Sequence, residues 1–422
     1  MTSNTHRLPY GNSPPGHWSV VPLKYLATLD NGYVFKSEDW QYSGTPIIRI
    51  ENLNGSSRYN YSALTLDDKY RVRSGDLLFA WSGNPGTSFG PFRWTESGHY
   101  FLNQHIFKVS VQSCEKDWLY WSLRAATYWI ERELTSGMIG MVHVTKDEVG
   151  AVPIPVPSRD QQRRIIDFLN AETARLDRLS ELQRKVIAGL DERDSVLLDV
   201  VIDELLAKHG TLPFRRFIEG VDQGSSPQCE ATPADDDEWG VLKVSSLRPG
   251  DFFPEQNKRL PENLTPNRSH EVREGDLLIT RANTPQLVGS TAAVPATRRK
   301  LLLSDKIFRV RLSPALDARY AALIARGSRV RSLCGATSNG ASQSMANIRF
   351  EEVKSWPIPP ADLDEQRRVV ARVESENLGT RSLREKIERQ LALLSERRQA
   401  LITAAVTGQI DVSTASGRGI ED

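Results

Sequence analysis

The sequence predicts an α+β protein in which two mixed α/β globules are separated by an antiparallel pair of long helices, a coiled coil, with a pseudo-twofold internal repeat. Three observations lead to this fold class. Residues 160–201 and 364–406 carry apolar residues at alternating steps of three and four. The two stretches match at a constant shift of 204 positions. The segment before each stretch also repeats, which indicates one duplicated unit.

The first long stretch, Asp160–Val201, has no proline and a single glycine, Gly189, so nothing in it forces a helix to break. At a rise of 1.5 Å per residue, about 40 residues make a helix about 60 Å long. A helix whose apolar residues form only a narrow stripe along one face needs a partner helix to cover that stripe. The apolar stripe consists of Ile165, Leu169, Leu176, Leu179, Val186, Leu190, Leu197 and Val200.

The partner helix is predicted in the same chain, at Asp364–Val406. Both stretches begin with the pattern DxQRR and share an LxER segment at the same shift. The first helix ends at the second globule and the second helix starts there, so paired helices must run antiparallel. The seam between them is predicted to contain Leu169, Leu176, Leu190, Leu197, Leu383, Ile387, Leu394 and Leu401.

Composition narrows the class of protein. A chain of 422 residues suggests two or three domains. The net charge of +1 gives no overall basic field for nucleic acid, although local basic patches remain compatible with phosphate binding. Cys114, Cys229 and Cys334 lie far apart, which argues against a disulfide framework or a zinc site and favours a reducing cytoplasm. No signal peptide or membrane-spanning run is expected.

The expected order along the chain is globule, helix, globule, helix. Residues 1–15 are predicted as a flexible N-terminus, 16–158 as the first globule and 159–207 as the first helix. Residues 208–360 form the second globule, 361–408 the second helix and 409–422 a flexible tail. In the first globule, strands are expected at residues 46–50 and 105–111, and a helix at 118–134. Residues 70–80 are expected to form a turn at Ser74–Gly75 followed by a strand. The X-Pro steps of residues 152–157 predict an extended link.

Three anchors of the first globule recur in the second. VRSGDLLF at Val72–Phe79 matches VREGDLLI at Val272–Ile279, and HIFKV at His105–Val109 matches KIFRV at Lys306–Val310. VPIP at residues 152–155 matches WPIP at 356–359. Between these anchors the globules differ strongly, which indicates one scaffold with two different surfaces. In each GDLL motif, the glycine suits a turn with positive φ, the aspartate can bind turn amides, and the leucines belong in a core.

Taken together, the two GDLL strands, the two PIP links, the two QRR helix starts and the closing stretch RRQALITAAVTGQI (Arg397–Ile410) resemble the specificity subunit of Type I restriction–modification enzymes. The resemblance extends from about Trp18 to Ile410. It implies two target-recognition domains, each reading one half of a split site in double-stranded DNA. It also implies that the helix pair sets the gap and docks two modification (methyltransferase) subunits, with restriction (motor–nuclease) subunits completing the complex.

The motifs that are absent favour a binding scaffold without catalysis of its own. The sequence has no GxxxxGK[ST] phosphate loop, no Asn/Asp-Pro-Pro-aromatic tetrapeptide and no HExxH metal motif. No cofactor is therefore expected in this chain; by the resemblance, S-adenosylmethionine, ATP and Mg²⁺ belong to the partner subunits. The alternatives are a self-sufficient DNA methyltransferase or nuclease, and a coiled-coil adapter that binds proteins rather than DNA.

The loop after each GDLL strand is the first candidate for DNA contact, because base edges are read by polar and basic side chains presented on turns. Arg281 could contact guanine bidentately, and Asn283 or Gln286 could contact adenine. The alternative is that these loops only connect strands. The candidates are Trp81, Ser82, Asn84 and Ser88 in the first globule, and Arg281, Asn283, Thr284 and Gln286 in the second.

Two further sets of residues are weaker candidates for DNA contact. The alternative for the first set is ordinary surface charge, and the alternative for the second is a flexible linker. The first comprises Arg49, Asn52, Asn54 and Arg58, matched by Lys243, Ser245, Ser246 and Arg248. The second comprises Ser136, Met138 and His143, matched by Ser338, Asn339, Gln343 and Ser344. His105 and His143 align with Lys306 and Asn347, which favours polar packing over a shared catalytic role.

The repeated QRR motif places cations at helix starts, where the helix dipole disfavours them. This arrangement indicates either a surface for a partner or a salt bridge to Asp160 or Asp364.

Overall fold

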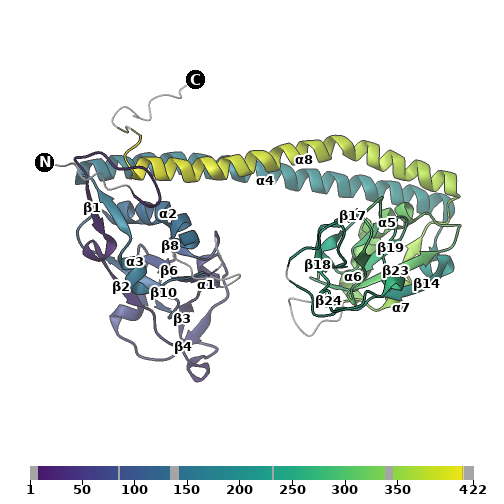
Figure 1. Cartoon of the computed structure of the whole chain (residues 1–422), viewed down its shortest axis with the longest axis horizontal. Helices are drawn as coiled ribbons and strands as arrows, with labels where there is room; N and C mark the ends of the chain where they lie inside the picture. Colours follow the sequence, from purple (N-terminus) through teal and green to yellow (C-terminus); the bar gives the residue numbers. More distant parts are fainter. Residues whose placement is uncertain are drawn as a thin grey trace. The chain divides into compact units, whose positions relative to one another are not determined.

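A computed structural model describes residues 8–83, 86–133, 142–230, 232–337, 346–410 and 412. The chain divides into two compact units. Unit 1 comprises residues 1–183 and 388–422, and unit 2 comprises residues 184–387. Helices α4 (Arg159–His209) and α8 (Leu363–Val406) are each continuous, and each contributes to both units (Figure 1). Both long helices predicted from the sequence are therefore confirmed.

Unit 1 is built on two four-stranded sheets, in the orders β2-β10-β6-β8 and β4-β3-β9-β5. The first sheet is antiparallel throughout, whereas β3 and β9 pair in parallel. Two short strand pairs, β1-β12 and β7-β11, complete the unit. The elements are β1 (Ser19–Pro22), β2 (Ala27–Asn31), β3 (Thr45–Ile48), α1 (Ile50–Leu53), β4 (Asn60–Ser62), β5 (Arg71–Val72), β6 (Leu77–Ala80), β7 (Ser82–Gly83), β8 (Gly90–Arg93), β9 (Tyr100–Leu102), β10 (Ile106–Val111), α2 (Lys116–Glu133), β11 (Val142–His143), α3 (Lys146–Gly150) and β12 (Pro153–Val156).

Unit 2 has the same plan. Its four-stranded antiparallel sheet has the order β14-β23-β19-β21, and its second sheet has the order β18-β15-β22 with β15 and β22 parallel. The short pairs are β13-β25 and β20-β24. The elements are β13 (Leu212–Pro213), β14 (Ile218–Gln223), β15 (Gly240–Leu242), β16 (Leu247–Arg248), β17 (Asp251–Phe252), β18 (Asn257–Arg259), β19 (Leu277–Thr280), β20 (Ala282–Asn283), β21 (Thr291–Ala293), β22 (Leu301–Leu302), β23 (Ile307–Leu312), α5 (Ala318–Arg326), α6 (Ser328–Thr337), β24 (Ala346–Asn347), α7 (Phe350–Val353) and β25 (Pro357–Ile358).

The GDLL motif leads into the central strand of each unit. Gly75 and Gly275 adopt φ values of 87° and 86°, and the carboxylates of Asp76 and Asp276 each accept a backbone N–H three residues back, at 2.9 Å. The predicted turn geometry is confirmed in both units. It is a positive-φ turn closed by its own aspartate.

All four residues of β6 are buried because this strand lies between two cores. Successive side chains of a strand point to opposite faces. Accordingly, Leu77 and Phe79 belong to the core that contains α2, whereas Leu78 and Ala80 belong to the core under the second sheet. Strand β19 divides its side chains in the same way. The apolar run after GD is thus explained by burial on both faces.

The core of each unit continues into the ends of the long helices. In unit 1, α2 lies between the sheet containing β8 and helix α4 (Figure 1), and the same core includes Leu169 of α4 and Val406 of α8. In unit 2, the core includes Leu205 of α4 and Val373 of α8. The helix ends are therefore part of the globular folds and are not appended to them.

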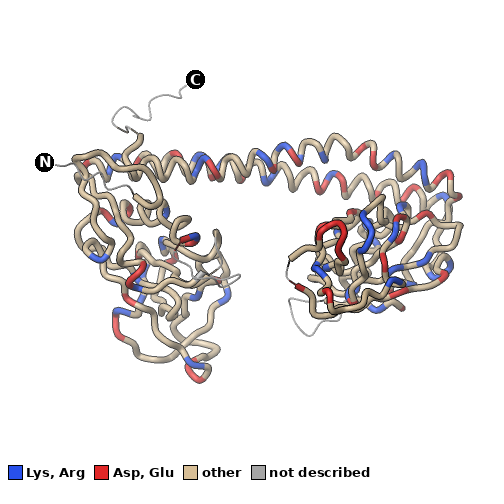
Figure 2. The backbone as a smooth tube through the Cα atoms, viewed as in Figure 1, with Lys and Arg blue, Asp and Glu red and all other residues tan. Residues whose placement is uncertain are grey.

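Between these anchored ends, α4 and α8 pair in opposite directions within each unit. In unit 1, Arg398 Nε donates to Asp177 (3.1 Å) and Gln183 Nε2 donates to Gln390 (2.9 Å). In unit 2, Asp191 pairs with Arg384, Arg193 with Thr380 (2.9 Å), and Glu204 with Arg372 (3.2 Å). As the residue number rises along α4, that of its partner falls along α8. Figure 2 shows charges of both signs spaced along both helices.

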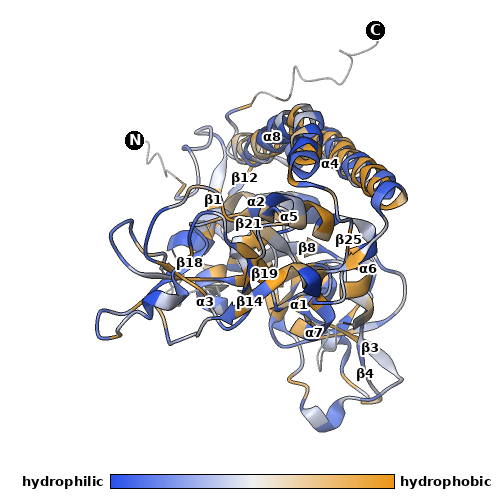
Figure 3. Cartoon of the chain, turned by 90° about the vertical axis from the view of Figure 1, so that its right-hand side faces the viewer, coloured by the Kyte–Doolittle hydropathy of each residue, from blue (hydrophilic) through white to orange (hydrophobic). Residues whose placement is uncertain are grey.

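The seam contains more polar residues than the sequence analysis expected. Thr173, Asn377 and Thr380 are buried in it, and the half-buried Arg384 approaches Asp194 at 3.7 Å. Figure 3 shows apolar and polar residues alternating around both helices. Polar seam residues weaken a helix pair but favour one register over others.

Four residues predicted to lie on the apolar stripe are on the exposed face. Leu179, Val186, Val200 and Leu383 are 43%, 48%, 49% and 44% exposed. The prediction of Leu383 in the seam is therefore wrong. A stripe that alternates steps of three and four passes through Thr380, Arg384 and Ile387, and apolar character alone selected the wrong neighbour. Leu169, Leu176 and Ile387 are buried, and Leu190, Leu197, Leu394 and Leu401 are half-buried.

Two boundary predictions also need correction. Residues 8–15, assigned to a flexible N-terminus, are packed: Leu8 is buried, and Tyr10 Oη donates to the Pro153 carbonyl at 2.6 Å. Ile410, assigned to the flexible tail, packs against the core of unit 1. The extended conformation predicted for residues 152–157 is confirmed, since residues 153–156 form β12, which pairs with β1. Within the described part of the chain, no helix has the length and apolarity needed to cross a membrane.

The seam assignment can be tested with two residues of α8 that lie one turn apart. Ile387→Ala removes a side chain that is 6% exposed, so unfolding should become easier by about 2–5 kcal/mol, the usual range for a buried aliphatic truncation. Leu383→Ala, on the exposed face, should change stability by less than about 0.5 kcal/mol. Urea unfolding of the full-length chain is the measurement. Equal losses in the two variants would contradict the seam described above.

Candidate nucleic-acid interface

Trp81 and Arg281 occupy matched positions immediately after the central strands β6 and β19. The Trp81 N–H donates to the His105 carbonyl (3.2 Å), and the Trp81 carbonyl accepts from the Val144 N–H (3.1 Å). The Arg281 N–H likewise donates to the Lys306 carbonyl (2.8 Å), and its carbonyl accepts from the Ile348 N–H (2.9 Å). Two units with different sequences thus hold this residue with the same backbone bonds.

The side chains at this position make equivalent contacts with different chemistry. Trp81 Nε1 donates to the carbonyl of Gln104 at 3.0 Å, and Arg281 Nη1 lies 3.4 Å from the carbonyl of Asp305. These carbonyls belong to the residues just before the matched anchors His105 and Lys306. One unit therefore places an aromatic ring where the other places a cation.

In unit 1, Trp81 organises a cluster of polar and aromatic side chains. Its ring lies 4.7 Å from that of His143 and 5.4 Å from that of His105. Gln104 Nε2 is 3.2 Å from His105 Nε2. Gln104 Oε1 and His105 Nδ1 are buried and have no hydrogen-bond partner among the described residues. Buried polar atoms without a partner are uncommon in folded proteins, so these two atoms make the cluster a candidate site for a polar ligand.

Arg49 adds a cation to this cluster. Its guanidinium donates to Asn60 Oδ1 (2.8 Å), pairs with Glu51 (3.1 Å) and lies 5.2 Å from the ring centroid of Trp40, which is partly exposed. Burial lowers the pKa of His105, and the nearby His143 and Arg49 lower it further. His105 is therefore neutral at neutral pH, with one ring nitrogen able to donate and the other able to accept.

The corresponding region of unit 2 has a different set of side chains. Ser245 Oγ donates to Gln256 Oε1 at 3.0 Å, and the Lys243 N–H donates to the Gln256 carbonyl at 3.0 Å. Asp305 is bound by Ser226 Oγ and, through its carbonyl, by Gln223 Nε2. The two histidines of unit 1 correspond here to Lys306 and to Asn347 of β24. The unit 2 surface is thus more basic at this point, with one acidic side chain.

Three residues selected from the sequence cannot serve as base readers. Ser82 and Ser88 are each 4% exposed, because Ser82 belongs to the strand pair β7-β11 and Ser88 packs beneath it. Asn52 is 6% exposed, and its amide closes its own loop by bonding Arg49 N–H and the carbonyls of Ser56 and Arg58. These predictions are wrong, since turn-forming Asn and Ser residues are often consumed by the turn itself.

The other candidates remain predictions. Thr284 and Gln286 are exposed, Asn283 is half-buried with Oδ1 accepting the Thr284 N–H, and Ser245 is exposed. In the second set, Asn54, Arg58 and Arg248 are exposed, whereas Ser246 is fully buried. The candidates that fall outside the described residues are Asn84, Ser136, Met138, Ser338, Asn339, Gln343 and Ser344.

The structure adds residues that the sequence analysis passed over. His105 and His143 were interpreted as ordinary polar packing, and Gln104, Trp40 and Asn60 were not considered. The hint in the sequence was that His105 is the first residue of the HIFKV anchor and that its matched residue in unit 2, Lys306, is charged. It could not show that Trp81, Arg49 and His143 converge on that histidine, because they come from three separate segments of the chain.

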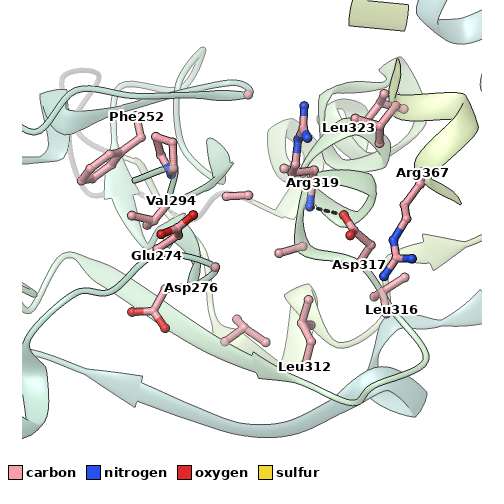
Figure 4. Close-up of a pocket in the computed structure, with 18 of the residues that line it drawn as sticks. Phe252, Glu274, Asp276, Val294, Leu312, Leu316, Asp317, Arg319, Leu323 and Arg367 are labelled. Carbon is pink, nitrogen blue, oxygen red and sulfur yellow. Dashed lines mark hydrogen bonds between the residues drawn. The ribbon is translucent and has the colours of Figure 1, made fainter. Parts of the chain in front are cut away.

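A cavity of about 1090 Å³ in unit 2 lies away from these residues, where β23, α5 and the start of α8 meet (Figure 4). Acidic and basic side chains both line it, including Glu274, Asp276 and Arg367. Figure 4 shows the Asp317 carboxylate bonded to the backbone N–H of Arg319, which caps α5. Because its charges are mixed, this cavity does not favour a ligand of one sign.

No group of three or more His, Cys, Asp or Glu side chains in the described ranges is arranged to hold a metal ion. The three cysteines are free, and Cys114 and Cys334 are buried. Burial raises the pKa of Cys114 to about 11, so this thiol is protonated at neutral pH.

Comparison with known proteins gives a consistent result. Residues 15–189 match the family described as the Type I restriction modification DNA specificity domain. Over these residues the chain is similar to the DNA specificity domain of Type I restriction–modification enzymes. The similar proteins include the EcoEI specificity subunit of Escherichia coli, 35% identical over 162 residues, which are 37% of this chain and 27% of that relative.

Two other specificity subunits align over most of their length. The EcoBI specificity subunit of Escherichia coli is 18% identical, covering 93% of this chain and 86% of that protein. The EcoKI specificity subunit of strain K12 is 21% identical, covering 95% and 90%. A solved chain from a study of assembly and conformational transition of the type I R-M system is 16% identical, covers 94% of this chain and 99% of its own, and has a TM-score of 0.59. This last similarity supports the mixed α+β fold with its long helix.

The lowered pKa of His105 predicts a pH dependence of stability. The pKa of His105 in the folded chain lies below the ordinary histidine value of 6.5, so the unfolded chain binds this proton more readily. The stability that the folded chain gains from holding His105 neutral is therefore fully present above about pH 6.5 and is lost as the pH falls below that value. Melting temperatures measured from pH 8 to pH 5 should fall less steeply for His105→Gln than for the unaltered chain. Parallel curves for the two proteins would show that this histidine is not buried as described.

Proposed function

We propose that the chain is the DNA-specificity subunit of a Type I restriction–modification system and that it reads a bipartite site in double-stranded DNA. The observation that carries this proposal is the matched position of Trp81 and Arg281. Both residues have the same backbone bonds and follow equivalent strands, yet they present different chemistry. One scaffold with two surfaces is what a reader of two different half-sites requires, because bases are distinguished by the donors and acceptors offered to them.

In this proposal the long helices form the spacer. They pair antiparallel as a coiled coil, and the two globule-plus-helix units are an internal repeat with pseudo-twofold symmetry. The fixed length of the pair sets the number of unread base pairs between the half-sites. The core contacts at both ends of α4 and α8 support this role, since they leave no loose linker between reader and spacer.

The chain acts as a scaffold and does not catalyse a reaction in this proposal. Two modification subunits supply methyl transfer from S-adenosylmethionine, and restriction subunits supply ATP- and Mg²⁺-dependent cleavage, in the cytoplasm where the DNA lies. The absence of the corresponding sequence motifs supports the assignment of these cofactors to the partners. The exposed Arg367 of the second QRR motif is a candidate docking residue, because its ion pair with Asp364 is long, at 3.9 Å.

Sequencing of methylated sites in a host that carries this chain with its modification partner tests the proposal. A split motif with two different halves is the expected result. Arg281→Ala should relax the motif at one position of one half, because losing a bidentate base contact typically costs about 1–3 kcal/mol of discrimination. Arg273→Ala is the matched control, since Arg273 is an exposed arginine that precedes the same strand. Equal effects of the two substitutions would contradict a base-reading role for Arg281.

Two binding measurements separate the alternatives. A self-sufficient methyltransferase would bind S-adenosylmethionine as the isolated chain, which calorimetry detects. A coiled-coil adapter would give no gel shift with duplex DNA, either alone or with a modification subunit. We expect no cofactor binding, and a gel shift that weakens steeply with salt because phosphate contacts release counterions.

A further inference from the structure

The glutamines of the two QRR motifs are among the most deeply buried polar residues in the described chain. Gln162 is 1% exposed and Gln366 is 0% exposed, although each lies in the first turn of a long, charged helix. The arginines that follow them are exposed. Burying a side-chain amide costs free energy unless its donor and its acceptor are both hydrogen-bonded.

Each glutamine ties together three segments of its unit. Gln162 Oε1 accepts the N–H of Glu115, just before α2, and Nε2 donates to the carbonyl of Pro157; both distances are 2.9 Å. Gln366 Oε1 accepts the N–H of Asp317 (2.8 Å), which caps α5, and Nε2 donates to the carbonyl of Ala361 (2.8 Å). The long helix, the strand that precedes it and the helix packed on the sheet are therefore joined through one side chain.

We call this junction between a globule and its long helix the joint. A second buried hydrogen bond reinforces the joint in each unit. Trp118 Nε1 donates to the Pro155 carbonyl (2.9 Å), and Tyr320 Oη donates to the Pro359 carbonyl (3.1 Å). Both rings are 0% exposed and come from α2 and α5. The two units use different residue types to bind the matched carbonyls of the PIP motifs. This indicates that the joint itself, and not one particular side chain, is what both units preserve.

Glutamine fits this joint because its amide offers a donor and an acceptor at the end of a three-atom stem. A glutamate would lose the donor to the Pro157 carbonyl, and an asparagine is one carbon shorter. The flanking arginines differ between the units: Arg163 pairs with Glu115 at 3.1 Å, whereas the Asp317 carboxylate is occupied in capping α5. The glutamine contacts are therefore the part of the QRR motif that both repeats share.

We propose that Gln162 and Gln366 are positioning residues that fix the direction in which each long helix leaves its globule, and thereby the gap between the two half-sites. This inference rests on the function proposed above. A helix of about 25 residues is a lever of about 40 Å, so a tilt of about 5° moves its far end by about 3.5 Å. That displacement equals the rise of one base pair. A loosened joint therefore allows gaps that differ by one base pair.

The test uses Gln162→Met and Gln366→Met in the full-length chain, expressed with the modification partner. Methionine keeps the length of the side chain but removes both hydrogen bonds. We expect unchanged half-sites together with at least a tenfold rise in methylation of sites whose gap is one base pair longer or shorter. Hydrogen exchange should show lost protection of the Glu115 amide in the first variant and of the Asp317 amide in the second.

Gln161→Met is the matched control, because Gln161 is the preceding residue but does not bond the segment before α2. Its Oε1 accepts from Ser158 N–H and Oγ (3.2 Å each), and its Nε2 lies 3.4 Å from Nε2 of His17. It should leave the gap unchanged. Trp118→Phe keeps the aromatic ring and removes only the bond to Pro155, so it should also broaden the gap if Gln162→Met does not fold.

A strict, unchanged gap in the Met variants and in Trp118→Phe would overturn the inference, as would a uniform loss of methylation at every gap from folded protein. Either result would mean that the joint serves stability alone. The proposed function and the role of the joint can fail separately. An unaltered chain that yields no split motif would refute the proposed function, whereas the amide exchange of Glu115 and Asp317 still reports on the joint.

Discussion

The apolar ends of α4 and α8 are buried in the globular cores, and the rest of the structure depends on that burial. A helix with a narrow apolar stripe is only marginally stable in water, so its stability must come from packing. Here each globule contributes to both helices: Ile165 and Ile402 share the core of unit 1, and Val201 and Val370 share that of unit 2. Helix formation and globule folding are therefore coupled in both units.

The middle of the helix pair follows a different rule. Thr173, Asn377 and Thr380 are buried where leucine or isoleucine would pack more strongly, and Arg384 lies between Asp191 and Asp194. Such residues lower stability, because polar groups lose hydration on burial. They also penalise sliding, because a shift by one heptad would separate each charge from its partner. A spacer must have one length, so this exchange of stability for register suits the proposed function.

The two units show how one scaffold can carry two chemically different surfaces. The backbone bonds of residues 81 and 281 hold the position fixed, while Trp81 supports a histidine pair and Arg281 offers a cation. Since the strands beneath are buried on both faces, substitutions at their ends change the surface without disturbing the core. The electrostatic character of each surface then follows from its own neighbours, such as Arg49 beside His105 or Asp305 beside Arg281.

The sequence alone determined the parts of this protein that depend on local pattern. The spacing of apolar residues defined both long helices, and the duplicated GDLL and PIP anchors defined matched strands, because helix and strand periods are properties of neighbouring residues. The turn at Gly75 and Asp76 followed from residue type alone. The family resemblance rested on the order of the same local motifs.

Tertiary structure decided what depends on the meeting of distant segments. Only packing showed that Leu383 faces solvent while Ile387 is buried, and that Ser82 and Asn52 are consumed within the fold. Only packing brought His105, His143 and Arg49 together. The role of the repeated glutamine also could not be read from the sequence. Its partners Glu115 and Pro157 belong to two different segments that meet only in the folded unit. A hydrogen bond between residues 47 positions apart leaves no trace in local sequence, because it is fixed by how the two segments pack and not by their spacing along the chain.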